Sequence, residues 1–207
     1  MFFNVNVQPL FCRDGTEIKQ ALTDAGEQDF VYLGSWCTKD RDIITRKALA
    51  WKSLHKLNKV WSSSMSRDIK LQLFRATTET ILLYGSSTWT LTKAEEKALD
   101  GTYTRMLRKV LNIDWSDKIS NTALYGSLCR VSETIRQRRL KLAGHVFRDK
   151  SSPAHLTVTW LPSHGYANRG KPPTSFVDTL INDTSASTVS ELETLMSDRD
   201  KWRSFSR

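Results

Sequence analysis

Residues 92–111 read TKAEEKALDGTYTRMLRKVL, and this stretch decides the fold class. Thr92, followed three residues later by Glu95, forms a capping box, the signature of a helix N-terminus. Beyond the box, large apolar side chains recur at the spacing of one buried helix face, at Leu99, Tyr103, Met106, Leu107 and Val110. The stretch therefore predicts an amphipathic helix that packs against other helices.

Similar patterns lie on both sides of this stretch. Gly85 is expected to end the preceding helix in the left-handed conformation, Ser132 is a candidate cap, and Thr188 with Glu191 forms a second capping box. Together with the apolar spacing, these signals predict helices over residues 38–61, 66–84, 121–126, 132–148, 174–182 and 188–205. The proline- and serine-containing stretch 151–173 is predicted to be a loop or linker.

The first 37 residues have a β pattern instead. Val5 and Val7 alternate with asparagines, Asp14-Gly15 is a tight-turn signal, and residues 30–33 form a short apolar strand that Gly34 ends. Strands this short make a poor free-standing sheet. The predicted fold is mainly α, with a short N-terminal β-hairpin or strand segment followed by a helical bundle and further helices.

Composition limits the possible functions. The chain has 207 residues and a net charge of +9, and its hydrophobic content of 39% is that of a globular protein. It has no apolar run long enough to span a membrane, and its first residues do not resemble a signal peptide. Three widely separated cysteines argue against a disulfide framework. We therefore expect an intracellular protein, nuclear or cytoplasmic, with no membrane partner.

Chemistry-bearing motifs are missing from the sequence. It contains no Asp-Asp pair, phosphate-binding glycine loop, nucleophile elbow or His-Glu-x-x-His motif. Cys129, His145, His155 and His164 lie within 36 residues, but their spacing is not that of a structural zinc site. The residues alone predict no catalytic site, no metal site and no cofactor.

Two basic blocks hold more than the whole net charge. Residues 38–62 carry +5 and residues 130–150 carry +5, and each block is predicted to be one helix. In the first block Lys52, Lys56 and Lys59 recur on one side, where they could neutralise phosphates. The second block is dense in arginine and lysine, at Arg136, Arg138, Arg139 and Lys141. An ordinary solvated helix face remains the alternative for both.

Tryptophans near the basic blocks have two possible roles. Trp51, Trp61 and Trp89 could stack on bases, although a tryptophan at helical spacing more often belongs to the core.

Several segments, in order, resemble the region after the catalytic palm in reverse transcriptases of non-LTR retrotransposons. They are residues 30–35 (FVYLGS), 81–89 (ILLYGSSTW), 100–108 (DGTYTRMLR), 138–148 (RRLKLAGHVFR) and 169–173 (RGKPP), the last two being similar to the family's RRLxxxGHxxR segment and RGRP turn. Cys37 and the 21–28 loop are looser than the family pattern.

The resemblance implies a division of the chain and a role for it. Residues 1–37 would be the tail of the palm, 38–112 a helical thumb that follows the template–primer duplex, and 113–150 the post-thumb helices with a basic helix over 132–148. Residues 151–173 would be a linker and 174–207 the C-terminal helices. The family's catalytic aspartates have no counterpart here, so the resemblance implies a C-terminal piece that does not polymerise alone.

The partner implied is an RNA–DNA or DNA duplex with its template RNA, together with the missing palm and fingers of the polymerase. A divalent metal such as Mg²⁺ is expected only in the full-length polymerase. The basic helices and the resemblance together predict nucleic-acid contacts by Tyr32, Gly34, Arg46, Lys47, Lys52, Lys56, Lys59, Arg105, Arg108, Arg136, Arg138, Arg139, Lys141 and Arg148.

Two other functions remain open at this point. The element at 121–126 followed by the helix at 132–148 could be a helix-turn-helix of a sequence-specific DNA-binding protein derived from a mobile element. The chain could also be a truncated, inactive frame that binds only by charge.

Overall fold

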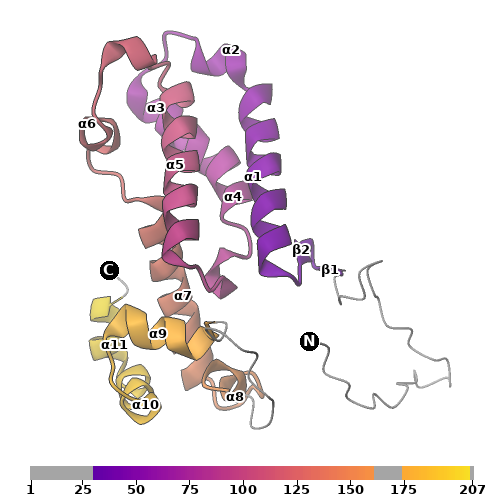
Figure 1. The fold of residues 1–207 in the computed structure, drawn as a ribbon, viewed down its shortest axis with the longest axis vertical. Helices are drawn as coiled ribbons and strands as arrows, with labels where there is room; N and C mark the ends of the chain where they lie inside the picture. Colours follow the sequence, from indigo (N-terminus) through magenta and orange to yellow (C-terminus); the bar gives the residue numbers. More distant parts are fainter. Residues whose placement is uncertain (1–29, 161–173, 206–207) are drawn as a thin grey trace, which may run out of the picture.

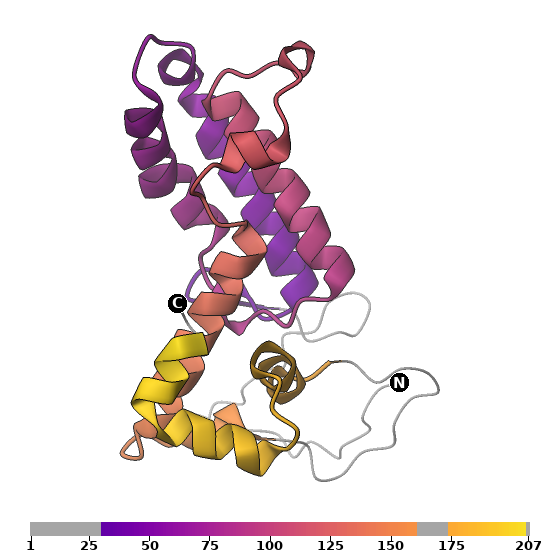
Figure 2. The same ribbon diagram turned by 90° about the vertical axis from the view of Figure 1, so that its left-hand side faces the viewer.

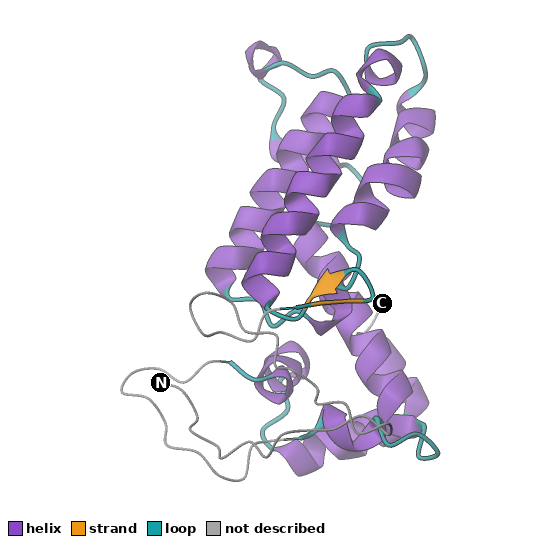
Figure 3. Ribbon diagram, turned by 90° about the vertical axis from the view of Figure 1, so that its right-hand side faces the viewer, coloured by secondary structure: helices purple, strands orange, loops and turns teal. Residues whose placement is uncertain are grey.

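The computed structural model describes residues 30–160 and 174–205, and these residues confirm the predicted fold class. A two-stranded hairpin is followed by helices that make up most of the rest (Figures 1 and 3). The strands expected near Val5 and Val7, the Asp14-Gly15 turn and residues 161–173 of the predicted loop lie outside the described residues. The described part of that loop contains the short helix α8 (His155–Val158), which was not predicted.

The hairpin consists of β1 (Val31–Tyr32) and β2 (Ser35–Trp36), which pair antiparallel. Leu33 and Gly34 form its turn with φ angles of 48° and 80°, the left-handed region that glycine adopts without strain. The hairpin is tied to the first helix, because Asp42 accepts a hydrogen bond from the Trp36 backbone nitrogen at 3.1 Å.

A first group of helices surrounds one hydrophobic core, which includes Leu54, Trp61, Phe74 and Met106. These helices are α1 (Lys39–Lys56), α2 (Asn58–Trp61), α3 (Arg67–Phe74), the π-helix η1 (Arg75–Glu79), α4 (Thr80–Leu82), the 3₁₀ turn η2 (Ser86–Thr88), α5 (Lys93–Val110), the 3₁₀ turn η3 (Trp115–Asp117) and α6 (Asn121–Tyr125). They form the upper bundle of Figure 1.

The predicted helix boundaries need corrections in this bundle. The helix expected over 38–61 is interrupted at Leu57, whose amide donates to the Leu54 carbonyl in a tightened last turn. The helix expected over 66–84 contains the π-helical turn η1. Gly85 has a φ of 72° as predicted, and a side chain there would also meet the Ser35 hydroxyl at 2.7 Å.

A second group of helices packs on a separate core that includes Leu140, Leu180, Leu192 and Trp202. It consists of α8 (His155–Val158), α9 (Phe176–Thr184), α10 (Val189–Ser197) and α11 (Arg199–Phe205). The helix expected over 188–205 is therefore two helices, which break at the extended residue Asp198.

Helix α7 (Val131–Arg148) joins the two groups, because Ile135 belongs to the first core and Leu140 to the second. Figure 2 shows this helix running from the bundle down into the second group. Its N-cap is Arg130; Ser132 lies in its first turn and donates to Asp100 from both its amide and its hydroxyl. No helix in the described part of the chain is long and apolar enough to cross a membrane.

The predicted capping box of α5 is present and extends to α1. The Glu95 carboxylate accepts from the Thr92 amide at 2.6 Å and pairs with Lys39 Nζ at 2.8 Å. Burial on its own raises the pKa of Glu95, but the hydrogen bonds from Lys39 and Thr92 outweigh it and lower the pKa below the ordinary 4.5.

A lowered carboxyl pKa makes this contact pH-dependent. Its contribution to the free energy of unfolding is present above about pH 4.5 and is lost as the pH falls through the lower folded-state pKa. Glu95→Gln should therefore cost about 1 kcal/mol near pH 6, and the difference from the wild type should shrink toward pH 3. Urea unfolding across this range measures it; a constant difference would contradict the assignment.

Candidate nucleic-acid interface

Three lysines follow the outer surface of α1 and α2. Lys52 and Lys56 are one helical turn apart on α1, Lys59 follows on α2, and all three are exposed. Within the described residues, their side chains make no hydrogen bond or ion pair. We call these three residues the lysine row.

The surroundings of the lysine row contain no compensating charge from the same segment. Residues 43–66 contain no aspartate or glutamate. The turn from Lys52 to Lys56 spans about 6 Å of helix, and duplex DNA carries roughly three or four phosphates over that length. Each of these lysines therefore has a phosphate within reach along a duplex backbone, without needing any base contact.

The other predicted residues near α1 have different environments. Lys47 is half-buried, and Tyr32 is 65% exposed on the hairpin. Arg46 is buried and donates to the carbonyl of Gly34 and to the hydroxyl of Ser35, so its guanidinium fastens the hairpin to α1. Its contact with nucleic acid, as predicted from the sequence, has no support in this geometry.

Arg41 was missed as a site residue. It is exposed on the same side of α1 as Lys52, eleven residues or about three turns away, and its guanidinium lies 3.7 Å from the centre of the Trp36 ring. The separation i, i+11 is the sequence signal that could have placed it there.

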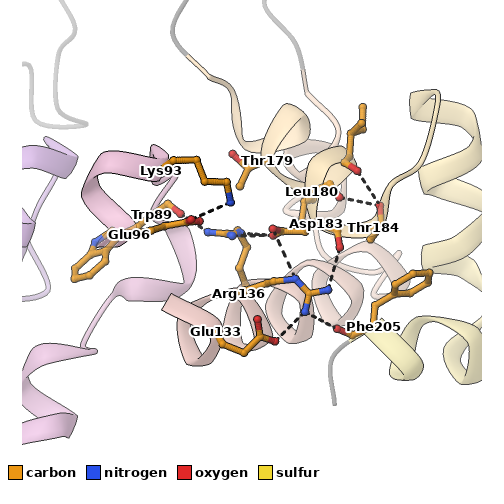
Figure 4. A network of polar contacts seen from close by, with 12 residues as sticks. Trp89, Lys93, Glu96, Glu133, Arg136, Thr179, Leu180, Asp183, Thr184 and Phe205 are labelled. Carbon is orange, nitrogen blue, oxygen red and sulfur yellow. Dashed lines mark hydrogen bonds and ion pairs between the residues drawn. The ribbon is translucent and has the colours of Figure 1, made fainter. Parts of the chain in front are cut away.

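The second basic block is used mostly inside the protein. Arg139 is 2% exposed; its Nε and Nη2 each lie 2.8 Å from the Asp183 carboxylate, and its Nη1 donates to the Trp89 carbonyl at 2.7 Å. Arg136 donates to the Asp183 carbonyl at 3.0 Å and to Glu133 at 3.0 Å (Figure 4). The nucleic-acid contacts predicted for Arg136 and Arg139 therefore have no support in this geometry.

Burial and the neighbouring arginines have opposite effects on the pKa of Asp183. Burial raises the pKa of its carboxyl above the ordinary value, and the charges of Arg139 and Arg136 lower it in part. The cost of burying this carboxylate is tolerable only because Arg139 holds it. The network therefore joins α7 to α9 and, through Trp89, to the first core.

The remaining cations of α7 are closer to solvent. Arg138 is exposed but donates to the Leu83 carbonyl at 3.1 Å, at the end of α4. Lys141 is exposed, and Arg148 donates to the Met196 carbonyl at 2.9 Å. On this helix Lys141 is the predicted contact residue whose charge has no partner among the described residues.

The two predicted arginines of α5 also differ. Arg108 is half-buried and holds the loop before α6, by donating to the Ile119 carbonyl at 2.7 Å and to Asn121 at 3.1 Å. Arg105 is exposed, with only a long 3.4 Å contact to Thr102.

The tryptophans mostly belong to the core. Trp61 is 1% exposed and donates to the Leu54 carbonyl at 2.8 Å, and Trp89 is 3% exposed and donates to Asp42 at 3.1 Å. Trp51 is half-buried beside the lysine row and stacks on His55, with ring centres 5.7 Å apart. Neither buried ring can accept a stacked base without unfolding.

The helix-turn-helix alternative is at odds with how α7 is packed. A recognition helix needs a free face that can enter the major groove. Helix α7 instead lies between the two cores, and its Arg136 and Arg139 make internal contacts with Asp183. This packing gives the helix-turn-helix prediction no support.

The described ranges contain no assembled metal-binding group. They hold no cluster of three or more histidine, cysteine, aspartate or glutamate side chains placed to bind a metal ion. His164, one of the four candidates from the sequence, lies outside those ranges.

Comparison with known proteins found no family model that matches the chain, and no curated protein or solved structure that matches it. The resemblance to reverse transcriptases therefore stays a prediction based on the motifs themselves.

Proposed function

We propose that this chain is a nucleic-acid-binding C-terminal part of a retrotransposon RNA-directed DNA polymerase. It holds an RNA–DNA or DNA duplex through backbone phosphates and carries no catalytic aspartates of its own. The single observation that supports binding is the lysine row, whose three charges are exposed and have no partner among residues 30–160 and 174–205. The five sequence motifs, which occur in the same order as in that family, support the polymerase origin.

Phosphate contact without base contact suits this role. A protein that follows a moving duplex has to hold every sequence equally, and backbone contacts carry no sequence information. Lysine ammonium groups are mobile point charges on flexible stems, so they can neutralise backbone phosphates in many orientations. Arg41 and Lys141 are further exposed cations, although they lie on different helices.

The test is binding of labelled RNA–DNA and DNA duplexes with unrelated sequences. If each lysine neutralises one phosphate, Lys52→Gln, Lys56→Gln and Lys59→Gln combined should weaken binding about 100-fold at 0.1 M salt, equally for all sequences. The matched control removes three exposed lysines elsewhere, Lys97, Lys109 and Lys118, and should change affinity less than about 3-fold. Equal losses in both variants would overturn the proposal.

Selection of duplexes from a random pool separates this function from sequence-specific binding. No sequence should be enriched, because the contacts reach only the backbone. Enrichment of a motif would favour a base-reading protein instead.

A further inference from the structure

A small pocket between α7 and α11 is lined almost entirely by cations. Its volume is about 320 Å³, and its lining residues are Lys141, Arg148, Arg199, Trp202 and Arg203. Lys141 and Arg148 lie on one side of α7, seven residues apart, and Arg199 and Arg203 lie one turn apart on α11. Figure 2 shows α11 packed along the lower half of α7.

Close packing fixes the two walls of this pocket. Trp202 is 2% exposed and donates from its indole nitrogen to the Leu140 carbonyl at 2.8 Å. Gly144 lies directly beneath the ring, because a Cβ there would meet the indole nitrogen at 2.2 Å. Arg148 is anchored by its bond to the Met196 carbonyl. The cations therefore converge on a preformed hollow.

Basic residues dominate the lining of the hollow, and one of them, Arg203, also has a contact of its own. No aspartate or glutamate lines it among the described residues. Asp198, at the start of α11, pairs with Lys201 at 3.4 Å, and Lys201 is not a lining residue. Like charges gathered around one hollow repel each other, so an anion that enters it gains more than it would at a single surface lysine.

The shape also limits what kind of anion fits. Trp202 is buried, so its ring offers no platform on which a base could stack. Arginine forks match the oxygens of phosphate, and the lining contains Arg148 from α7 and Arg199 from α11. The hollow thus favours a phosphate group recognised by charge and geometry.

We propose that this pocket is a phosphate-binding site, and that its phosphate comes from the backbone of the nucleic acid bound by the chain. The identity of the source rests on the proposed function, whereas the affinity for phosphate does not. Sequence analysis missed Arg199 and Arg203 because residues 151–207 have a net charge of zero. Their spacing of four residues on one helix is the signal that was overlooked.

The test measures the binding of inorganic pyrophosphate, the probe, to the full chain by calorimetry at low salt. Wild-type protein should bind one pyrophosphate, and Arg199→Gln with Arg203→Gln should weaken this at least 10-fold. The matched control, Lys97→Gln with Lys201→Gln, removes two exposed charges outside the pocket and should bind as the wild type does. Circular dichroism checks that both variants keep their helices.

Duplex binding by the same variants separates the two proposals. Loss of pyrophosphate binding together with at least 3-fold weaker duplex binding, in the pocket variant only, supports the inference in full. Pyrophosphate binding with no duplex binding by the wild type keeps the site and refutes the proposed function. Absence of specific pyrophosphate binding, with duplex affinity equal in both variants, overturns the pocket inference alone.

Discussion

Replacing Arg139 with methionine should destabilise the protein by about 3–5 kcal/mol. Methionine fills a similar volume but leaves the Asp183 carboxylate, which is 13% exposed, without the guanidinium that now lies 2.8 Å away. The Trp89 carbonyl loses its donor in the same step. For a chain of this length, the midpoint of thermal unfolding should fall by roughly 6–20 °C.

Two further variants identify the cause of that loss. Lys141→Met changes an exposed cation on the same helix and should shift stability by no more than about 0.5 kcal/mol. Arg139→Met combined with Asp183→Leu removes both charges and should recover part of the loss, because no unpaired buried charge remains. A single variant as stable as the wild type would show that Arg139 is not held as described.

Gly144→Ala should destabilise the second group of helices by about 3 kcal/mol. The new methyl group would meet the Trp202 ring at 2.2–2.3 Å, so α11 must shift away from α7. That shift also breaks the hydrogen bond from Trp202 to the Leu140 carbonyl. Urea unfolding, with helix content as the signal, measures the effect.

Gly101→Ala is the matched control, because Gly101 lies within α5 and a Cβ there meets nothing within 4 Å. The same substitution should raise stability at this position by about 0.5–1 kcal/mol, since alanine favours a helix more than glycine does. The free energy of unfolding should therefore fall in Gly144→Ala and rise in Gly101→Ala. A stabilising Gly144→Ala would contradict the close packing of α11 on α7.

Local signals predicted much of the fold. The Thr92–Glu95 capping box and the left-handed Gly85 mark helix ends where the structure has them, because each acts within a few residues of the chain. The breaks at Leu57 and Asp198 carry no glycine or proline. Asp198 nevertheless carries a local signal, because its carboxylate accepts from the Asp200 and Lys201 amides and so caps α11. Leu57 has no comparable capping side chain, so local sequence does not predict the break there.

In the candidate site, too, local patterns were predicted from the sequence and long-range contacts were not. The lysine row was identified from spacing alone, and its residues are exposed. The role of Arg139 was misjudged because Asp183 and the Trp89 carbonyl lie 44 and 50 residues away in sequence. Charge density along a helix predicts a cationic face only when no distant acid or carbonyl folds onto it.

The salt dependence of duplex binding tests the central claim most directly. For the wild type and for the variant lacking the three lysines of the row, the logarithm of the binding constant is measured against the logarithm of salt concentration between about 50 and 200 mM. Each lost phosphate contact should make the slope shallower by about 0.9, so the variant should differ by 2 to 3. Parallel lines, or wild-type binding that does not change with salt, would contradict the claim that the lysine row holds a nucleic-acid backbone.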